Sequence, residues 1–248
     1  MKLTFLGTSH GVPSKEKYCS CCMIEIGDNI YFIDAGAPVV DKLLRMEKNL
    51  NNVKAFFITH SHGDHTNGLF NICHLFNWYF TKTSMDLFLT EERFKTAFKE
   101  MLACMNTGRP LCEDRIRLHI ASTGVVFEDE NIRVTYFPTS HMSEFGLLSY
   151  GILIEAEGRR ILFSGDCSYL LGAHDLPPML ESLPVDLFIC ELAHFGINEC
   201  GEYIERSLAD KVVMTHVLES NMDGLLEYAR TSKKSIVAAY DGMEITFD

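Results

Sequence analysis

The chain has 248 residues, of which 47% are hydrophobic and 23% charged, and this size predicts one globular domain over residues 1–248. No apolar run reaches the roughly 18 residues needed to cross a membrane, and the first residues do not resemble a signal peptide. The formal net charge of −12 disfavours extended nucleic-acid binding. The nine scattered cysteines fit reduced thiols in the cytoplasm better than a disulfide framework.

Apolar periodicity and turn residues predict strands and helices along the whole chain. In the first half, strands are expected at residues 2–6, 23–26, 30–33, 53–58 and 85–89, with helices at 38–50, 69–80 and 91–105. In the second half, strands are expected at residues 117–120, 124–127, 132–137, 149–156, 160–163, 186–190, 211–214, 235–239 and 243–247, with one helix at 221–231. The chain is therefore expected to fold as a mixed α/β protein.

Residues 59–65 read Thr-His-Ser-His-Gly-Asp-His and concentrate four metal-binding side chains, His60, His62, Asp64 and His65. In extended backbone His60 and His62 point the same way, whereas the adjacent Asp64 and His65 diverge, which suits ligands of two different ions. A helical zinc motif needs two histidines four residues apart, and this stretch instead follows an apolar strand. We therefore expect a loop site at the edge of a sheet.

Histidine or aspartate also follows other predicted strands within a few residues. The five residues in these positions are His60, His141, Asp166, His194 and His216. Side chains that leave the same ends of neighbouring strands gather at one edge of a sheet, where binding sites commonly form. Five residues of ligand type in this position predict a metal centre.

The pattern His-x-His-x-Asp-His resembles the metallo-β-lactamase superfamily, whose dinuclear hydrolases have a four-layer αββα sandwich of the α/β (α+β) class. The opening Leu-Gly-Thr-Ser-x-Gly-x-Pro of residues 6–13 resembles the phosphodiesterase branch of that superfamily. This branch includes the tRNase Z endonucleases and the cyclic phosphodiesterase of phosphonate breakdown. The resemblance implies a hydrolase with two divalent metal ions.

The resemblance also implies which residues bind the ions. The matching positions are His60, His62 and His141 for the first ion, Asp64, His65 and His216 for the second, and Asp166 as the bridge between them. Asp34, in an Asp-x-Gly that follows a strand, is expected to support the histidine loop. Imidazole and carboxylate ligands favour zinc or manganese, with iron as a further candidate.

Two further predictions concern Asp64 and the pair of His194 and Glu191. Asp64 is expected to belong to the catalytic group, because redox-active diiron members of the superfamily typically carry glutamate there whereas hydrolases keep aspartate. His194 is interpreted either as a general acid that Glu191 orients, or as a histidine that only packs behind the ligands. Both interpretations stay open at this point.

A second metal site is considered at three closely spaced thiols, Cys19, Cys21 and Cys22. They could hold a structural zinc, although no fourth ligand is evident. Reduced thiols in the core are the alternative.

The expected function is hydrolysis of a small nucleotide-like or cyclic phosphodiester. The alternatives are a lactone or thioester hydrolase, a tRNA 3′-processing endonuclease and a metal-binding regulator without activity. The tRNA alternative is disfavoured because no Gly- and Lys-rich arm interrupts the chain. The expected partner is a small phosphodiester or ester, a membrane partner is not expected, and a homodimer stays open.

Overall fold

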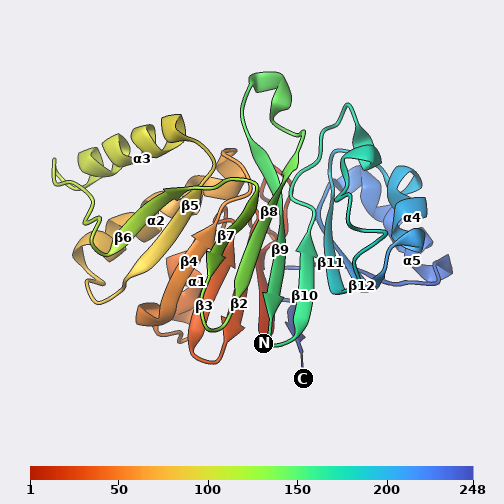
Figure 1. The fold of residues 1–248 in the computed structure, drawn as a ribbon, viewed down its shortest axis with the longest axis horizontal. Helices are drawn as coiled ribbons and strands as arrows, with labels where there is room; N and C mark the ends of the chain where they lie inside the picture. Colours follow the sequence, from red (N-terminus) through yellow and green to blue (C-terminus); the bar gives the residue numbers. More distant parts are fainter. Residues whose placement is uncertain (248) are drawn as a thin grey trace. The chain divides into compact units, whose positions relative to one another are not determined.

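The computed structural model describes residues 1–247, and the chain divides into two compact units. The first unit comprises residues 1–7, 11–121 and the segment from 241 onward, and the second comprises residues 8–10 and 122–240. Each unit contains one seven-stranded sheet (Figure 1). The single domain over residues 1–248 stays a prediction.

The sheet of the first unit has the strand order β14-β1-β2-β3-β4-β5-β6. The pairs from β14 to β3 are antiparallel, and those from β3 to β6 are parallel. Gly27 adopts a positive φ of 56° and allows the tight turn between β2 and β3. The strands are β1 (Lys2–Gly7), β2 (Cys21–Ile26), β3 (Asn29–Ile33), β4 (Val53–Phe57), β5 (Met85–Leu89), β6 (Ile116–Ile120) and β14 (Glu244–Thr246).

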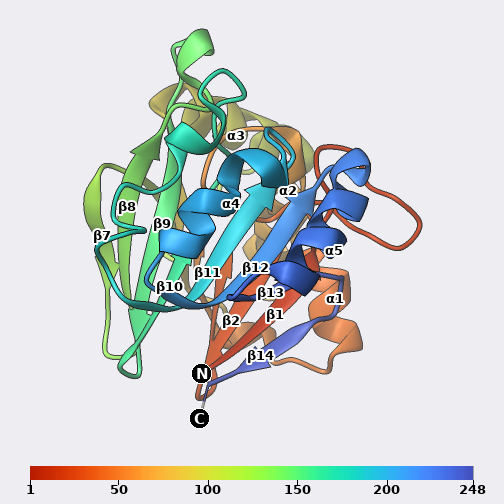
Figure 2. The same cartoon turned by 90° about the vertical axis from the view of Figure 1, so that its right-hand side faces the viewer.

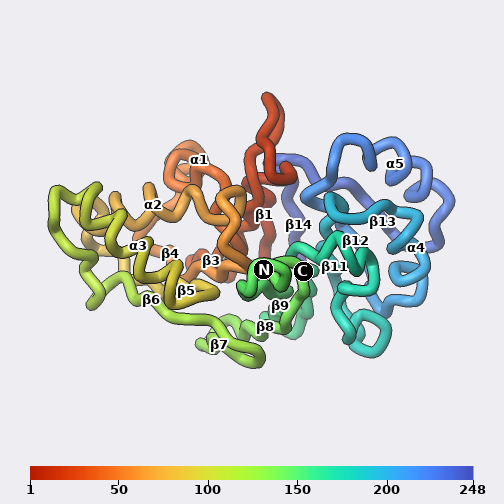
Figure 3. The backbone as a smooth tube through the Cα atoms, turned by 90° about the horizontal axis from the view of Figure 1, so that it is seen from above, coloured from red at the N-terminus to blue at the C-terminus, as the bar shows by residue number. Residues whose placement is uncertain are grey.

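Three helices of the first unit, α1 (Val39–Arg45), α2 (Gly63–Trp78) and α3 (Glu92–Met105), connect the parallel strands β3 to β6. Parallel neighbours cannot be joined by a tight turn, so each connection crosses the sheet as a helix. Seen from above, α1 and α2 lie on the same side of these strands (Figure 3). Phe32 and Phe56 stack below the helices with ring centroids 4.4 Å apart. Burial of each such ring contributes about 1.5–3 kcal/mol.

The sheet of the second unit has the order β13-β12-β11-β10-β9-β8-β7 and repeats the pattern of the first. The pairs from β7 to β10 are antiparallel, and those from β10 to β13 are parallel. Both halves of the sequence therefore build the same kind of half-parallel sheet. The strands are β7 (Gly124–Glu128), β8 (Arg133–Thr139), β9 (Ser149–Ala156), β10 (Arg159–Phe163), β11 (Val185–Leu192), β12 (Ala209–Val217) and β13 (Ser235–Ala238).

Two helices of the second unit, α4 (Ile197–Arg206) and α5 (Met222–Thr231), pack against its parallel strands (Figure 2). Ile204 of α4 and Leu225 of α5 share one buried cluster with Phe188 and Met214 of β11 and β12. Short 3₁₀ turns complete the described elements, η1 (Leu50–Asn52), η2 (Ser143–Phe145), η3 (Gly172–Asp175) and η4 (Glu219–Asn221). Within residues 1–247 no helix is both long and apolar enough to cross a membrane.

The predicted strands are all present, but two predicted helices have wrong bounds and a third helix was missed. The helix expected at 38–50 ends at Arg45, where Glu47 takes a positive φ of 56° and turns the chain. Helix α2 begins at Gly63, six residues before the expected start. Helix α4 was not predicted, although Ile197, Cys200 and Ile204 recur at helical spacing and are all buried.

Candidate metal centre

The histidine cluster of the first unit spans the end of a strand and the start of a helix. His60 and His62 follow β4, whereas Asp64 and His65 lie in the first turn of α2. The loop prediction is therefore right for the first two side chains and wrong for the last two. An aspartate in the first turn is favoured by the partial positive charge at a helix N-terminus.

The donor atoms of this cluster converge. Nε2 of His60 lies 3.0 Å from Nδ1 of His62, and Nε2 of His65 lies 3.3 Å from a carboxylate oxygen of Asp64. The rings of His60 and His65 are 4.1 Å apart between centroids, and both are buried. Imidazole nitrogens and a carboxylate gathered this closely form a donor set of the kind that binds divalent cations.

Asp34 orients His65 from behind. Its Oδ2 accepts a hydrogen bond from Nδ1 of His65 at 2.7 Å, and its Oδ1 accepts one from the backbone N–H of Thr59 at 2.8 Å. A proton fixed on Nδ1 leaves the lone pair of His65 on Nε2, which is the arrangement of a metal-ligating histidine. Asp34 itself holds a φ of 59°, a left-handed conformation that non-glycine residues adopt mainly at special sites.

Residues 34–38, between β3 and α1, form a loop that we call the Asp34 loop. Glycine is required where this loop meets α2. A Cβ atom on Gly36 would lie 1.7 Å from the carbonyl oxygen of Asp64, and one on Gly68 would lie 2.4 Å from that of Ala35. The close approach lets the backbone N–H of Ala35 donate to the carbonyl of His65 at 2.8 Å. The loop therefore fixes the backbone as well as the ring of His65.

The second unit gathers its own donors at the ends of strands. One ligand atom from each of His141, Asp166 and His194 lies within 4.8 Å of the others. Oδ2 of Asp166 lies 3.2 Å from Nε2 of His216 and 3.9 Å from Nε2 of His141. Asp166 is almost completely buried, so a positive charge beside it would be stabilised more strongly than at the surface.

Two local features aim the histidines of the second unit. Nδ1 of His141 donates to the carbonyl of Cys167 at 3.1 Å, which leaves the ring's lone pair on Nε2. His216 has a φ of 50° and is the extra residue of a β-bulge, because Glu191 pairs with Thr215 while the next residue of β11 pairs with Val217. Bulges re-aim side chains at functional sites.

Glu191 holds His194. The carboxylate is 2% exposed and accepts hydrogen bonds from the backbone N–H groups of Cys167, Ala193 and His194 at 2.6–3.1 Å. Its Oε1 also lies 3.0 Å from Nδ1 of His194. Because a carboxylate oxygen accepts in this contact, the ring proton of His194 sits on Nδ1. The His194 ring lies edge-on to His141 with centroids 4.5 Å apart.

Asp175 in η3 is a supporting residue that the sequence did not reveal. Its Oδ2 accepts from the backbone N–H groups of Ser140 and Ser168, both at 2.8 Å. These two serines flank His141 and Asp166, so one carboxylate ties together both ligand loops. No local pattern marks it, because its bond to Ser140 joins residues 35 positions apart.

The three-thiol hypothesis finds no matching geometry. Cys21 and Cys22 are consecutive in β2, so their side chains point to opposite faces, and burial raises the pKa of both thiols well above the usual range. Within residues 1–247, none of the groups of three or more possible metal ligands includes a cysteine. The alternative of protonated core thiols fits this arrangement.

The family model described as "Anti-Pycsar protein Apyc1" matches residues 1–183. The chain belongs to this family. In this Apyc1-family protein the matched part includes the histidine cluster, Asp34, His141 and Asp166, whereas His194 and His216 lie beyond it.

Individual proteins are similar to this Apyc1-family chain over different lengths. Ribonuclease Z of Picosynechococcus sp. (strain ATCC 27264 / PCC 7002 / PR-6) is 31% identical over 150 residues, 59% of this chain and 46% of that protein. The chain thus spans about half the length of the curated relatives it matches. The metallo-β-lactamase-fold protein YhfI from Bacillus subtilis has a TM-score of 0.76 at 16% identity, with 99% of each chain covered. A diphosphatase of the PhnP family has a TM-score of 0.72 at 17% identity, covering 100% of this chain and 98% of that one.

The structural similarity confirms the predicted metallo-β-lactamase fold, and the sequence similarity to ribonuclease Z agrees with the predicted resemblance to the tRNase Z group. They also confirm the predicted α/β fold class with two mixed sheets.

Proposed function

We propose that this protein is a divalent-metal-dependent phosphodiesterase that hydrolyses a small nucleotide-like or cyclic phosphodiester. The observation that carries the proposal is the arrangement in the second unit, where Asp166 faces the Nε2 atoms of His141 and His216, and Glu191 holds His194 alongside. The names of two relatives, a ribonuclease and a diphosphatase, both describe cleavage of phosphate ester or anhydride bonds and support this reaction class.

Seven side chains are proposed to hold two ions. Their roles are His60, His62 and His141 for one ion, Asp64, His65 and His216 for the other, and Asp166 as the bridge. The fit rests on orientation, because His65 and His141 each use Nδ1 on a protein oxygen and keep Nε2 for a ligand bond. Zinc or manganese suits such donors, with iron as a third candidate. The ions, when bound, would supply the charge that activates water and stabilises the transition state.

The remaining chemistry falls to residues of the chain. His194 is proposed to hold a proton at Nε2 and to donate it to the leaving oxygen as the bond from phosphorus to that oxygen breaks. Glu191 fixes the opposite ring nitrogen through its 3.0 Å contact, so that the acidic proton faces outward. The side chain of His194 is 23% exposed, which leaves it accessible to a substrate.

The proposed substrate is a small molecule, and the proposed compartment of the reaction is the cytoplasm. A net charge of −12 repels a long polyanion, whereas a compact phosphodiester can be neutralised locally by bound cations. The second candidate is tRNA 3′ processing, which the name of the ribonuclease Z relatives favours. If the protein cleaves a precursor tRNA much faster than a small diester, tRNA processing replaces the small-substrate proposal.

The proposed function is tested by hydrolysis of bis(p-nitrophenyl) phosphate. We expect turnover that EDTA abolishes and that Mn²⁺ or Zn²⁺ restores, together with about two metal ions per chain by elemental analysis. Activity on lactones or thioesters alone would replace the phosphodiesterase by an acyl hydrolase. Full metal loading without turnover of any ester would contradict an enzymatic role and favour a metal-binding regulator.

An Asp34→Asn variant is expected to weaken metal binding about 10–100-fold, the usual effect of removing a carboxylate that orients a ligating histidine. The amide cannot supply both the charge and the two acceptor oxygens that now bond His65 and Thr59. A competition titration against a chelating dye measures the change. The matched control is Asp28→Asn in the exposed β2–β3 turn, and equal affinity of the two variants would contradict the role of Asp34.

A further inference from the structure

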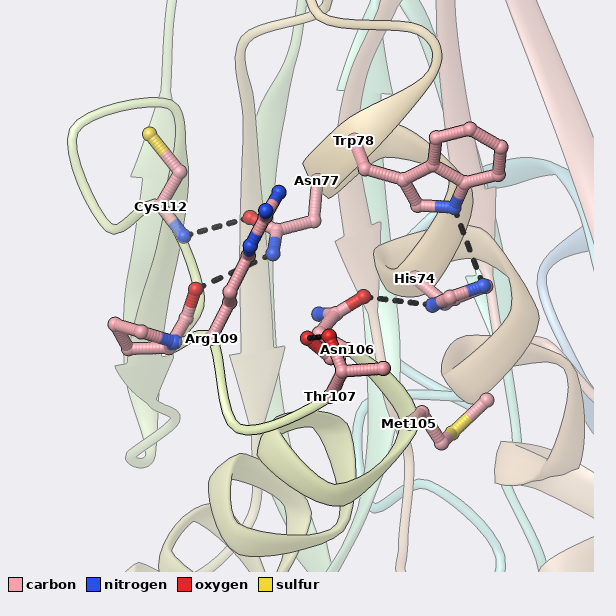
Figure 4. Close-up of a pocket in the computed structure, with 9 residues that line it drawn as sticks. His74, Asn77, Trp78, Met105, Asn106, Thr107, Arg109 and Cys112 are labelled. Atoms are coloured by element: carbon pink, nitrogen blue, oxygen red, sulfur yellow. Dashed lines mark hydrogen bonds between the residues drawn. The ribbon is translucent and has the colours of Figure 1, made fainter.

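The first unit contains a cavity at the far end of α2 from the histidine cluster (Figure 4). It has a volume of about 530 Å³, within the range of roughly 300–1,000 Å³ typical of small-molecule sites. Its walls come from the last turns of α2 and α3 and from residues 106–112. At 1.5 Å per helical residue, His65 and Trp78 lie about 20 Å apart along α2. The cavity is therefore separate from the ligands that this unit supplies.

A chain of hydrogen bonds fixes the polar wall of the cavity. The indole Nε1 of Trp78 donates to Nε2 of His74 at 3.2 Å, and Nδ1 of His74 lies 2.7 Å from Oδ1 of Asn106. An indole N–H can only donate, so Nε2 of His74 must accept and the imidazole proton sits on Nδ1. Nδ1 of His74 therefore donates a hydrogen bond to Oδ1 of Asn106, and this bond sets the orientation of the amide.

The amide nitrogen of Asn106 is left without an acceptor. Asn106 is 7% exposed, and its Nδ2 is buried with no hydrogen-bond partner among residues 1–247. Because the oxygen is committed to His74, the amide cannot flip to relieve this. Buried donors are almost always paired in folded proteins, and an orphan of this kind marks a place where an acceptor belongs.

The turn beside Asn106 is strained. Thr107 and Gly108 have φ angles of 57° and 84°, and a β-branched residue such as threonine rarely adopts the left-handed region. Figure 4 shows Thr107 next to the Asn106 amide at the cavity wall. Asn77, in contrast, anchors the opposite wall firmly, since its side chain bonds the backbone of Cys112 at 2.8 Å and of Pro110 at 3.2 Å.

Two exposed side chains complete the lining. Trp78 lines the cavity and is 55% exposed, and exposed aromatic side chains bind nucleobases by stacking. Arg109 is exposed, and no carboxylate among the described residues pairs with its guanidinium, the group best suited to phosphate. An exposed tryptophan, an exposed arginine and the asparagine that carries the orphan amide donor thus line one cavity.

We propose that this cavity is a binding site for a nucleoside monophosphate whose base carries an exocyclic carbonyl oxygen. The base stacks on Trp78, the carbonyl accepts from Nδ2 of Asn106, and the phosphate pairs with Arg109. The proposal includes a shift of the turn at Thr107 and Gly108, because Nδ2 of Asn106 is buried in the structure and the base must reach it. The inference goes beyond the proposed phosphodiesterase and does not depend on it, because it concerns binding without turnover.

Trp78 is the only tryptophan of the chain, so its fluorescence reports directly on the cavity. The probes are GMP, AMP, guanosine and ribose 5-phosphate, titrated into the full-length protein. We expect saturable quenching by GMP and about tenfold weaker binding of each other probe, since AMP lacks the carbonyl, guanosine the phosphate and ribose 5-phosphate the base. Equal affinity for GMP and ribose 5-phosphate, or no saturable response to GMP, would overturn the proposal.

Variants separate this site from the proposed metal centre. Asn106→Asp keeps an acceptor for His74 but removes both donors, and it should weaken GMP at least about tenfold. Arg109→Gln should do the same, whereas the matched Arg93→Gln on the exposed start of α3 should not. If circular dichroism shows that Asn106→Asp does not fold, the comparison of Arg109→Gln with Arg93→Gln tests the site instead. Equal GMP affinity of these two variants would then overturn the proposal. His141→Ala must retain GMP binding, and loss of binding there would assign the signal to the metal centre and reject the cavity.

Discussion

An Asp166→Asn variant is expected to lose phosphodiesterase activity by about 10³-fold. The carboxylate is buried, and its Oδ2 lies 3.2 Å from Nε2 of His216 and 3.9 Å from Nε2 of His141, which suits the proposed role as a bridge between two ions. Removing such a charge costs several kcal/mol of transition-state stabilisation, and each 1.36 kcal/mol is a factor of ten in rate. The measurement is the rate on bis(p-nitrophenyl) phosphate together with the metal content per chain.

The control for this variant is Asp210→Asn, a substitution of the same chemistry at an exposed position of β12. It should leave both rate and metal content unchanged. An Asp166→Asn protein that stays folded, binds its full complement of metal and keeps its rate would contradict the bridging role. Asp64 and the histidines would then remain as the proposed ligands.

A His194→Ala variant is expected to slow the hydrolysis of substrates with poor leaving groups by about 10²–10⁴-fold, the usual contribution of a general acid. An alkoxide must be protonated as it departs, whereas p-nitrophenolate is stable enough to leave without help. The rate on bis(p-nitrophenyl) phosphate should therefore fall much less than the rate on an alkyl or nucleoside diester. Comparing kcat for the two substrates in one variant measures the difference.

Glu191→Gln should show the same leaving-group dependence in weaker form, because the amide keeps the shape but loses the charge that fixes Nδ1 of His194. His174→Ala is the matched control, since that histidine bonds Tyr203 at 2.6 Å on the surface of the second unit. Equal losses on good and poor leaving groups would reject the acid role. His194 would then be a packing histidine, the alternative that its sequence context also allows.

The strands and the positions of the candidate ligands were predictable because both depend on local patterns. Apolar runs that alternate or stay continuous over five to eight residues specify strands wherever they fold. His60, His141 and Asp166 each follow such a run directly, so counting along the sequence placed them at strand ends. Ile197, Cys200 and Ile204 also recur at helical spacing, so α4 could have been predicted from the sequence in the same way.

The start of α2 was not predictable in this way. Gly63, Asp64 and His65 are polar or flexible residues that favour loops, yet they form the first helical turn. The close approach of Gly36 and Gly68 to neighbouring carbonyls brings the Asp34 loop against this turn and stabilises it. Tertiary packing therefore overrides the local preference at these residues.

By itself, the sequence determined which chemical groups this protein offers and at which strand ends they emerge, because periodicity and residue type act over a few positions. Only the tertiary structure decided how those groups are aimed. The bonds from Asp34 to His65, from His141 to Cys167 and from Asp175 to Ser140 join residues 26–35 positions apart, and the bulge at His216 exists only through pairing with β11. Such contacts depend on how distant segments pack, and no local pattern of residues records them.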